Sequence, residues 1–188
     1  MEVFTKAEVQ KRYEEIIQKI VQGVIFIHPS DTIYGLGCNA LDAKAVENVR
    51  KLKEQFHQPI SIWVPSLDWV RQNCVLSKEG EEALKKLPGP YTLVMKLKNK
   101  KSIAANVTLG KDTIGIRLPD HWFSKVVAKA GIPIITTSAN KTGQKFMTSL
   151  QDLHTKIEEA VEFMIYEGPK EAHPSKIINT VEGTVKER

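Results

Sequence analysis

Cysteine is scarce in this sequence, and long hydrophobic runs are missing. The two cysteines, Cys38 and Cys74, do not form a C-x-x-C pair, so neither a disulfide framework nor a cysteine zinc site is expected. This cysteine usage is typical of a reducing compartment. The first residues, MEVFTKAEVQKRYEE, have no apolar signal core, and no apolar run of about 18 residues follows. These absences predict a cytoplasmic protein that does not associate with a membrane.

Several catalytic signatures are missing as well. The sequence has no G-x-x-x-x-G-K-[ST] phosphate loop, no H-E-x-x-H metal motif and no G-x-S-x-G nucleophile elbow. Residues 35–40 match G-x-G-x-x-[GA], but residues 29–34 separate them from the preceding apolar run, unlike in a dinucleotide-binding fold. If the protein is an enzyme, we expect positioning and electrostatics to do most of the work, as in nucleotidyl transfer.

Charged residues of both signs are plentiful. There are 27 Lys and Arg against 22 Asp and Glu, and the net charge of +5 mildly favours anionic partners such as nucleotides or RNA. Hydrophobic residues make up 41% and charged residues 26% of the chain, as is typical of a soluble protein with a real core. The length of 188 residues predicts a single domain over residues 1–188.

Hydrophobic periodicity predicts a mixed α/β fold. Helices are expected at 6–22 behind a Thr5 capping box, after the N-caps Asp42, Ser66 and Ser77, and at 121–130. Strands are expected at 24–27, 60–64, 91–97, 112–118, 132–138, 162–166, 176–180 and 184–186. The polar, lysine-rich stretch 99–112 is expected to be a mobile loop. Since helices and strands interleave without strict alternation, we expect a twisted mixed or parallel sheet flanked by helices.

Four stretches carry groups suited to a small anionic ligand. Residues 28–37, HPSDTIYGLG, combine hydroxyls with two glycines, and residues 51–61, KLKEQFHQPIS, follow a helix that ends in cations. Residues 136–143, TTSANKTG, offer hydroxyls and backbone N–H groups to phosphate oxygens. Arg117 ends an apolar strand. Because ligands collect where strands of α/β sheets end, these stretches together predict a binding site.

Each stretch also has a purely structural interpretation. Thr32 and Tyr34 could be turn and core residues, and Lys53 could merely complement a helix dipole. Arg117 could belong to a partly buried ion pair, and the T-S-A-N segment could be a turn that leads into a helix. The case for a ligand site therefore rests on the occurrence of all four stretches together.

The same stretches resemble the YrdC-type threonylcarbamoyl-AMP synthase family in their order and spacing. The resemblance is carried by HPSDTIYGLGCNA, KLKEQFHQPISIWV, PGPYTLVMKLK, TIGIRLPDH, TTSANKTG and SKIINTVEGTVKER, from about residue 24 to the end of the sequence. It implies the YrdC-like twisted sheet with a concave, positively charged cavity. It also implies that L-threonine, bicarbonate and ATP, with Mg²⁺, are condensed to threonylcarbamoyl-AMP and pyrophosphate. A separate transferase would then deliver the threonylcarbamoyl group to adenosine 37 of ANN-decoding tRNAs.

The resemblance further implies roles for individual side chains, none of them as an acid or base. Its threonine-binding residues are Thr32, Tyr34, Arg117 and Ser175; its ATP-binding residues are Lys53, Ser138, Asn140 and Arg188; and Ser30 is a further candidate near both ligands. No protein side chain is expected to hold the metal.

One departure from the family pattern leaves alternatives open. Where the family has K-x-R, this chain has Lys53-Glu54-Gln55, so Gln55 is a candidate site residue and Arg50, one helical turn earlier, could supply the missing cation. A second hypothesis is therefore a paralogue that binds RNA or nucleotide without adenylate synthesis, and a third is a subunit that docks on the transferase. The small charge excess predicts at most weak, salt-sensitive binding of tRNA or double-stranded RNA.

Overall fold

The computed structural model describes residues 1–171 and 173–187. The helices are α1 (Lys6–Lys11), α2 (Tyr13–Val21), α3 (Ala43–Lys53), α4 (Leu67–Asn73), α5 (Lys78–Leu84), α6 (Ala105–Thr108), α7 (Ser124–Ala130) and α8 (Thr155–Ala160), with short 3₁₀ helices at Lys100–Ser102 and Leu150–Asp152. The strands are β1 (Glu2–Phe4), β2 (Phe26–His28), β3 (Gly35–Gly37), β4 (Ile62–Trp63), β5 (Tyr91–Lys96), β6 (Thr113–Arg117), β7 (Ile134–Ile135), β8 (Thr137–Ser138), β9 (Phe163–Ile165), β10 (Lys176–Asn179) and β11 (Thr184–Lys186).

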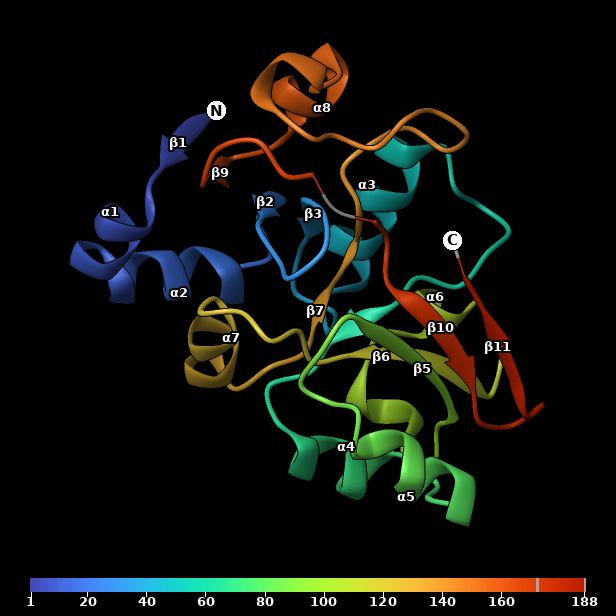
Figure 1. Cartoon of the computed structure of the whole chain (residues 1–188). Helices are drawn as coiled ribbons and strands as arrows, with labels where there is room; N and C mark the ends of the chain where they lie inside the picture. Colours follow the sequence, from blue (N-terminus) through green and yellow to red (C-terminus); the bar gives the residue numbers. More distant parts are fainter. Residues whose placement is uncertain (172, 188) are drawn as a thin grey trace.

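The strands form two mixed sheets flanked by helices (Figure 1). One sheet has the order β1-β9-β2-β3-β8 and the other has the order β11-β10-β5-β6-β4-β7. Both contain parallel and antiparallel pairs, for example β2 parallel to β9 and antiparallel to β3. The expected mixed α/β fold is confirmed, with its strands divided between two sheets.

The five-stranded sheet is buried on both faces because its strands alternate between two apolar clusters. Phe26 packs with the helices α1, α2 and α7, whereas its neighbour Ile27 packs on the other face with Ile157 of α8. Phe163 and Met164 of β9 divide in the same way. Figure 1 shows α2 and α7 on one side of this sheet and α8 on the other.

The six-stranded sheet covers the largest apolar cluster. Ile62, Leu93, Met95, Ile114 and Ile116 project from its central strands onto one face. They pack against apolar side chains of α3, α4 and α5. Burial of aliphatic side chains stabilises a fold by roughly 1.5–3 kcal/mol each, so this cluster fixes α3 against the sheet. The carboxyl end of α3 is thereby held close to the place where the two sheets meet, which we call the seam.

Local capping explains where the helices begin and end. Thr5 makes the expected capping box with Glu8, and Asp42 accepts from the backbone N–H groups of Lys44 and Ala45 at the start of α3. The expected helix at 6–22 is interrupted at Arg12, which ends α1 and precedes α2. Glu54 terminates α3 in the left-handed conformation, with φ of 56°.

The expectation of a mobile loop at 99–112 is wrong. This stretch contains the 3₁₀ helix Lys100–Ser102 and α6, in which Val107 and Thr108 are buried. The carbonyl oxygen of Val107 accepts from the backbone N–H of Ile60 and from the Arg50 guanidinium. The polar composition of residues 99–112 gave no indication of these two hydrogen bonds, because their donors, Ile60 and Arg50, lie far away in the sequence.

The two sheets meet where the chain passes directly from one to the other. β7 belongs to the six-stranded sheet and β8 to the five-stranded sheet, so only Thr136 separates them in sequence. The chain also changes sheet between β3 and β4 and between β9 and β10. The hydroxyl-rich residues 29–34 connect β2 to the antiparallel β3 and reach the same seam. Within residues 1–171 and 173–187, no helix combines the length and apolar character needed to cross a membrane.

Candidate functional site

Two adjoining cavities lie at the seam between the sheets. The smaller has a volume of about 150 Å³ and the larger about 370 Å³. Ser61, Thr136, Thr137 and Ser138 line both, so one wall is shared. Arg117 lines the smaller cavity, Lys53 and Lys186 line the larger, and neither has an Asp or Glu among its described lining residues. Such a lining favours two anionic groups side by side.

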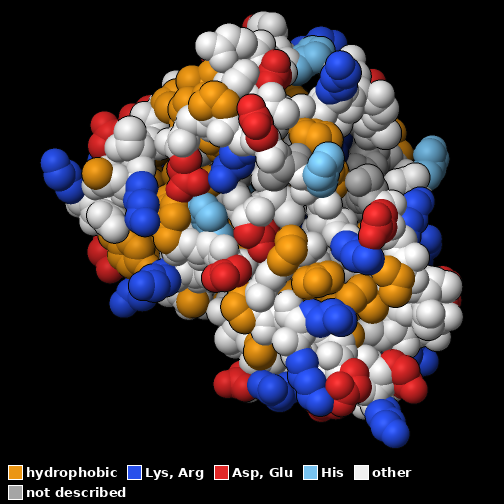
Figure 2. All heavy atoms as spheres, in the orientation of Figure 1, with side chains coloured by type: hydrophobic (Ala, Val, Ile, Leu, Met, Phe, Trp, Pro, Cys, Tyr) orange, Lys and Arg blue, Asp and Glu red, His pale blue; other side chains and the backbone are white. Residues whose placement is uncertain are grey.

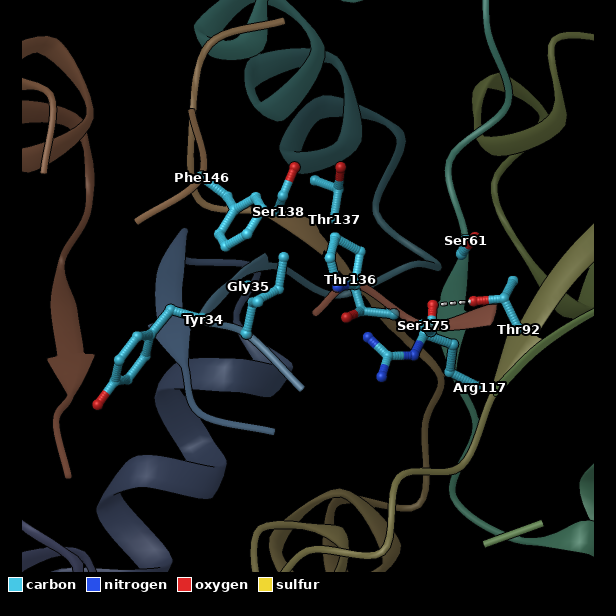
Figure 3. A pocket seen from close by; sticks show the side chains of 12 residues that line it. Tyr34, Gly35, Ser61, Thr92, Arg117, Thr136, Thr137, Ser138, Phe146 and Ser175 are labelled. Carbon is cyan, nitrogen blue, oxygen red and sulfur yellow. Dashed lines mark hydrogen bonds between the residues drawn. The ribbon is translucent and has the colours of Figure 1, made fainter. Parts of the chain in front are cut away.

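The Arg117 guanidinium defines the smaller cavity. Arg117 is buried at the end of β6, and its Nη2 donates to Asp31 Oδ1 at 3.1 Å and to Thr32 Oγ1 at 3.0 Å. Figure 3 shows the guanidinium pointing into the cavity toward Gly35. A planar guanidinium held in this way is suited to a carboxylate.

Hydroxyl groups surround Arg117. Ser175 Oγ and Thr92 Oγ1 lie 2.7 Å apart, bonded across the cavity wall (Figure 3). Tyr34 lines the same cavity, but its hydroxyl donates to the Gly168 carbonyl at 2.6 Å and points away from Arg117. Tyr34 thus contributes backbone and ring surface, while its hydroxyl anchors the segment after β9 at Glu167 and Gly168.

Lys53 lies in the wall of the larger cavity and holds the loop after β8. Its Nζ donates to the carbonyls of Ser138 at 2.6 Å and Asn140 at 2.7 Å, and to Asn140 Oδ1 at 3.0 Å. The Lys53 carbonyl accepts from both the N–H and the hydroxyl of Thr142. Since an ammonium has three donors, the side chain of Lys53 is fully used by this loop.

Burial also changes the titration of Lys53. Removal from water lowers the pKa of its ammonium to about 8, because desolvation disfavours the charged form. The group stays mostly protonated at neutral pH and contributes a positive field from behind residues 138–142. The loop itself places Ser138 and Asn140 at the cavity surface.

The structure brings together most of the residues expected from the sequence. Arg117, Ser175 and Tyr34 meet at the smaller cavity, with Thr32 bonded to Arg117 behind it. Lys53, Gln55, Ser138 and Asn140 meet at the larger one. Arg188 lies outside the described residues.

Two candidates have structural contacts instead. The Ser30 hydroxyl is buried, donates to the Ile33 carbonyl at 2.8 Å and bonds to Thr32 Oγ1, so it shapes the 29–34 connection. Arg50 was expected to replace a phosphate-binding arginine. Its guanidinium instead donates to four backbone carbonyls, those of Gln55, Gln58, Asn106 and Val107, and it lines neither cavity. The expected compensation by Arg50 is therefore not supported by its geometry.

Several lining residues lie outside the four stretches singled out in the sequence, among them Thr92, Phe146, Pro174 and Lys186. Thr92 is a buried polar residue within the apolar run YTLVMK, and this was a usable signal. Lys186 gave no signal, because a lysine in an exposed terminal strand is ordinary.

The lining offers oxygen atoms but no metal-binding cluster. Within the described part of the chain, no group of three His, Cys, Asp or Glu residues could hold a metal ion. The Ser138 hydroxyl oxygen fits a hard cation such as Mg²⁺, which keeps most of its shell as water and phosphate oxygen, whereas Asn140 Oδ1 already accepts from the Lys53 ammonium. The residues present are thus compatible with Mg²⁺ that arrives on a nucleotide.

Comparison with known proteins extends over nearly the whole chain. Residues 18–187 match the family model Sua5/YciO/YrdC, described as "Telomere recombination". A Methanocaldococcus jannaschii relative is 34% identical over 175 residues, covering 91% of this chain and 82% of that protein. The threonylcarbamoyl-AMP synthase of Idiomarina loihiensis is 25% identical, covering 91% of this chain and 95% of that protein.

Solved structures agree with the fold. Sua5 of Pyrococcus abyssi in complex with L-threonine superposes with a TM-score of 0.81 and 26% identity, over 95% of this chain and 53% of that chain. The present chain thus spans about half of that protein. Escherichia coli YciO, with 21% identity and a TM-score of 0.82 over 95% of this chain and 90% of that chain, shares the fold. The chain belongs to the Sua5/YciO/YrdC family.

Proposed function

We propose that this protein is an L-threonylcarbamoyladenylate synthase, a nucleotidyltransferase that condenses L-threonine, bicarbonate and ATP to threonylcarbamoyl-AMP and pyrophosphate. The observation that carries the proposal is the pair of adjoining cavities, each with a cationic side chain and neither with a carboxylate. Two relatives with the name threonylcarbamoyl-AMP synthase and a threonine complex of P. abyssi Sua5 support it.

In this proposal the smaller cavity binds threonine. The carboxylate pairs with the Arg117 guanidinium, and the hydroxyls of Thr32 and Ser175 complete the polar surroundings. Asp31 orients Arg117 from the side away from the ligand. The threonine amino group and bicarbonate form a carbamate with loss of water, and enclosure between the sheets shields this short-lived group.

The larger cavity binds the phosphates of ATP. A carbamate oxygen attacks the α-phosphorus at the shared wall of Ser61, Thr136, Thr137 and Ser138, and the bond to pyrophosphate breaks. The reaction joins two anions, so the site must offset their repulsion and hold them in line. Ser138 and Asn140 contact the phosphates, and the buried Lys53 ammonium supplies positive potential through the loop that it holds.

Mg²⁺ bound with ATP would neutralise phosphate charge, and its protein neighbour would be the Ser138 hydroxyl oxygen. This role needs no carboxylate in the lining, consistent with the way proteins bind Mg²⁺ together with nucleotides.

RNA and the transferase are secondary partners in this proposal. Figure 2 shows Lys and Arg distributed around the displayed face and mixed with Asp and Glu, without a continuous basic stripe on that face. Binding of tRNA or double-stranded RNA would then be weak and salt-sensitive. The product, a reactive mixed anhydride, requires a threonylcarbamoyl transferase to consume it.

The decisive experiment measures pyrophosphate release. The purified protein is incubated with ATP, Mg²⁺ and bicarbonate, with L-threonine, L-valine or no amino acid. Release that depends on threonine is expected, and Arg117→Met should abolish it. ATP binding without any threonine-dependent release would instead favour the non-catalytic paralogue, for which the presence of Gln55 at the larger cavity is the structural argument.

A further inference from the structure

The terminal hairpin forms one wall of the larger cavity. β10 and β11 pair antiparallel, with Ile177 opposite Lys186 and Ile178 opposite Val185. Residues that face each other in a register share one side of a sheet, and successive residues alternate. Ile177 and Lys186 therefore share the cavity side, and both line the cavity, whereas Ile178 packs on the opposite side against the main apolar cluster.

Lys186 differs from the lysines around it in having no acidic partner within the described residues. Lys176 on β10 pairs with Glu187 at 2.6 Å, and Lys141 beside the cavity pairs with Glu54 at 2.5 Å. The cavity lining itself contains no Asp or Glu. The Lys186 ammonium thus has its three donors available to a ligand.

Among the described residues that line the larger cavity, Lys186 is the cation best placed to bind an anion directly. Lys53 uses its three donors on Ser138 and Asn140, and Gln55 and Gln58 are neutral. Direct charge-assisted bonding to an anion in this cavity is available from Lys186 without breaking a contact. An ammonium on a flexible stem acts as a point charge that suits phosphate oxygens.

The position of Lys186 in the lining also indicates which phosphates of ATP lie within its reach. In the proposed reaction the α-phosphorus lies at the wall shared with the smaller cavity. Lys186 is not part of that wall, and it lines only the larger cavity, together with Thr142 and Gly143. We propose that Lys186 directly binds the β- and γ-phosphates of ATP, the part that leaves as pyrophosphate. This inference rests on the proposed function for the identity of the nucleotide.

The test measures binding of pyrophosphate and of AMP separately, so that the contact with the β- and γ-phosphates can be distinguished from a contact with the α-phosphate. Calorimetric titrations with inorganic pyrophosphate, AMP and L-threonine, with Mg²⁺ present, compare the wild type with Lys186→Met, Lys186→Arg and Lys176→Met. Loss of a charge-assisted hydrogen bond is expected to raise the dissociation constant for pyrophosphate about 10- to 100-fold in Lys186→Met. Lys186→Arg should restore most of the affinity. AMP and threonine should bind all four proteins equally.

Lys176→Met is the matched control, because Lys176 lies on the same hairpin but is paired with Glu187 and does not line the cavity. Unchanged pyrophosphate affinity in Lys186→Met, or an equal loss of AMP affinity, would overturn the assignment, as would failure of the wild type to bind pyrophosphate. These binding results do not depend on turnover. Absence of pyrophosphate release by the wild type would refute the synthase while leaving a lost pyrophosphate affinity in Lys186→Met as support for the phosphate contact.

Discussion

Arg117 and Asp31 form an ion pair in which Arg117 Nη2 lies 3.1 Å from Asp31 Oδ1, and their side chains are only 9% and 10% exposed. The other Asp31 oxygen accepts from the backbone N–H of Asp120 at 3.0 Å. One carboxylate therefore ties the β2–β3 connection to the end of β6 and to the segment beyond it. It fixes the guanidinium from behind, and the guanidinium points into the smaller cavity (Figure 3).

Removal of this carboxylate should affect both stability and threonine binding. We expect Asp31→Ala to lower the free energy of unfolding by on the order of 3 kcal/mol, because breaking a buried pair leaves a buried charge uncompensated. Threonine affinity should fall more than ATP affinity. Urea unfolding and calorimetry measure these effects. Asp68→Ala removes the exposed pair with Arg71 and should change stability by less than about 1 kcal/mol; equal losses in both variants would contradict the assignment.

Arg50 should prove to be a folding residue. Arg50→Met removes a donor from four backbone carbonyls, of which Val107 keeps the Ile60 N–H, and unsatisfied buried groups each cost about 1–3 kcal/mol, so we expect a large loss of unfolding free energy. The KM for ATP of the folded fraction should stay unchanged. Lys51→Met, at an exposed position of the same helical turn, is the control. If Arg50→Met instead raised the KM for ATP and left the free energy of unfolding unchanged, Arg50 would be a phosphate ligand after all.

His28 should make stability depend on acid pH. Burial lowers the pKa of its imidazole to about 3, against 6.5 in an unfolded chain. Between about pH 6.5 and pH 3, His28 is protonated in the unfolded chain but not in the folded protein. The free energy of unfolding therefore decreases as the pH falls through this range. Between pH 6.5 and 4.5 the wild type should lose about 2 kcal/mol more than His28→Phe, measured by urea unfolding. Parallel pH profiles would disprove this contribution.

Gly35 should tolerate no side chain. A Cβ at this position would lie 2.6 Å from His28 Cε1 and 2.8 Å from Nε2, and His28 is held by stacking on Phe123. Gly35→Ala should therefore lower stability by about 1–3 kcal/mol through overpacking and distort the smaller cavity, which Gly35 lines. A Cβ at Gly80 in α5 would lie 3.2 Å from the flexible end of Met95 and at an ordinary contact distance of 3.6 Å from Ser77 Oγ, so Gly80→Ala should be nearly neutral. Thermal unfolding and threonine titration compare the two, and equal stability would show that His28 can move.

The sequence allowed the element types and several caps to be predicted, because these depend on local patterns. The Thr5 and Asp42 caps, the strand at β5 and the helix α3 follow from side-chain spacing and hydrogen-bonding chemistry. The division into two sheets could not be predicted, since the run GIPIITTS reads as one strand although the chain changes sheet at Thr136. The short β3, made of Gly35–Gly37, lacks the bulky residues that mark a strand.

The site was predicted where the motif residues themselves line a cavity, as for Arg117 and Ser138. The prediction failed for contacts between distant segments. The four carbonyls that bind Arg50 and the register that turns Lys186 toward the larger cavity depend on tertiary packing, which no local pattern records. A cation near a helix end is as compatible with backbone carbonyls as with phosphates, so the side-chain type alone could not decide between them.

The single wall common to both cavities makes their ligands thermodynamically dependent on each other. A ligand in either cavity faces the same four side chains around Thr136. If the first ligand to bind orders them, the entropic penalty for the second is lower. Linkage then requires the effect to be mutual. The factor by which a bound nucleotide raises the affinity for the amino acid equals the factor by which the bound amino acid raises the affinity for the nucleotide. The one-residue link between two sheets thus brings one set of side chains to both cavities, and any ordering of that set by a ligand favours the doubly occupied state.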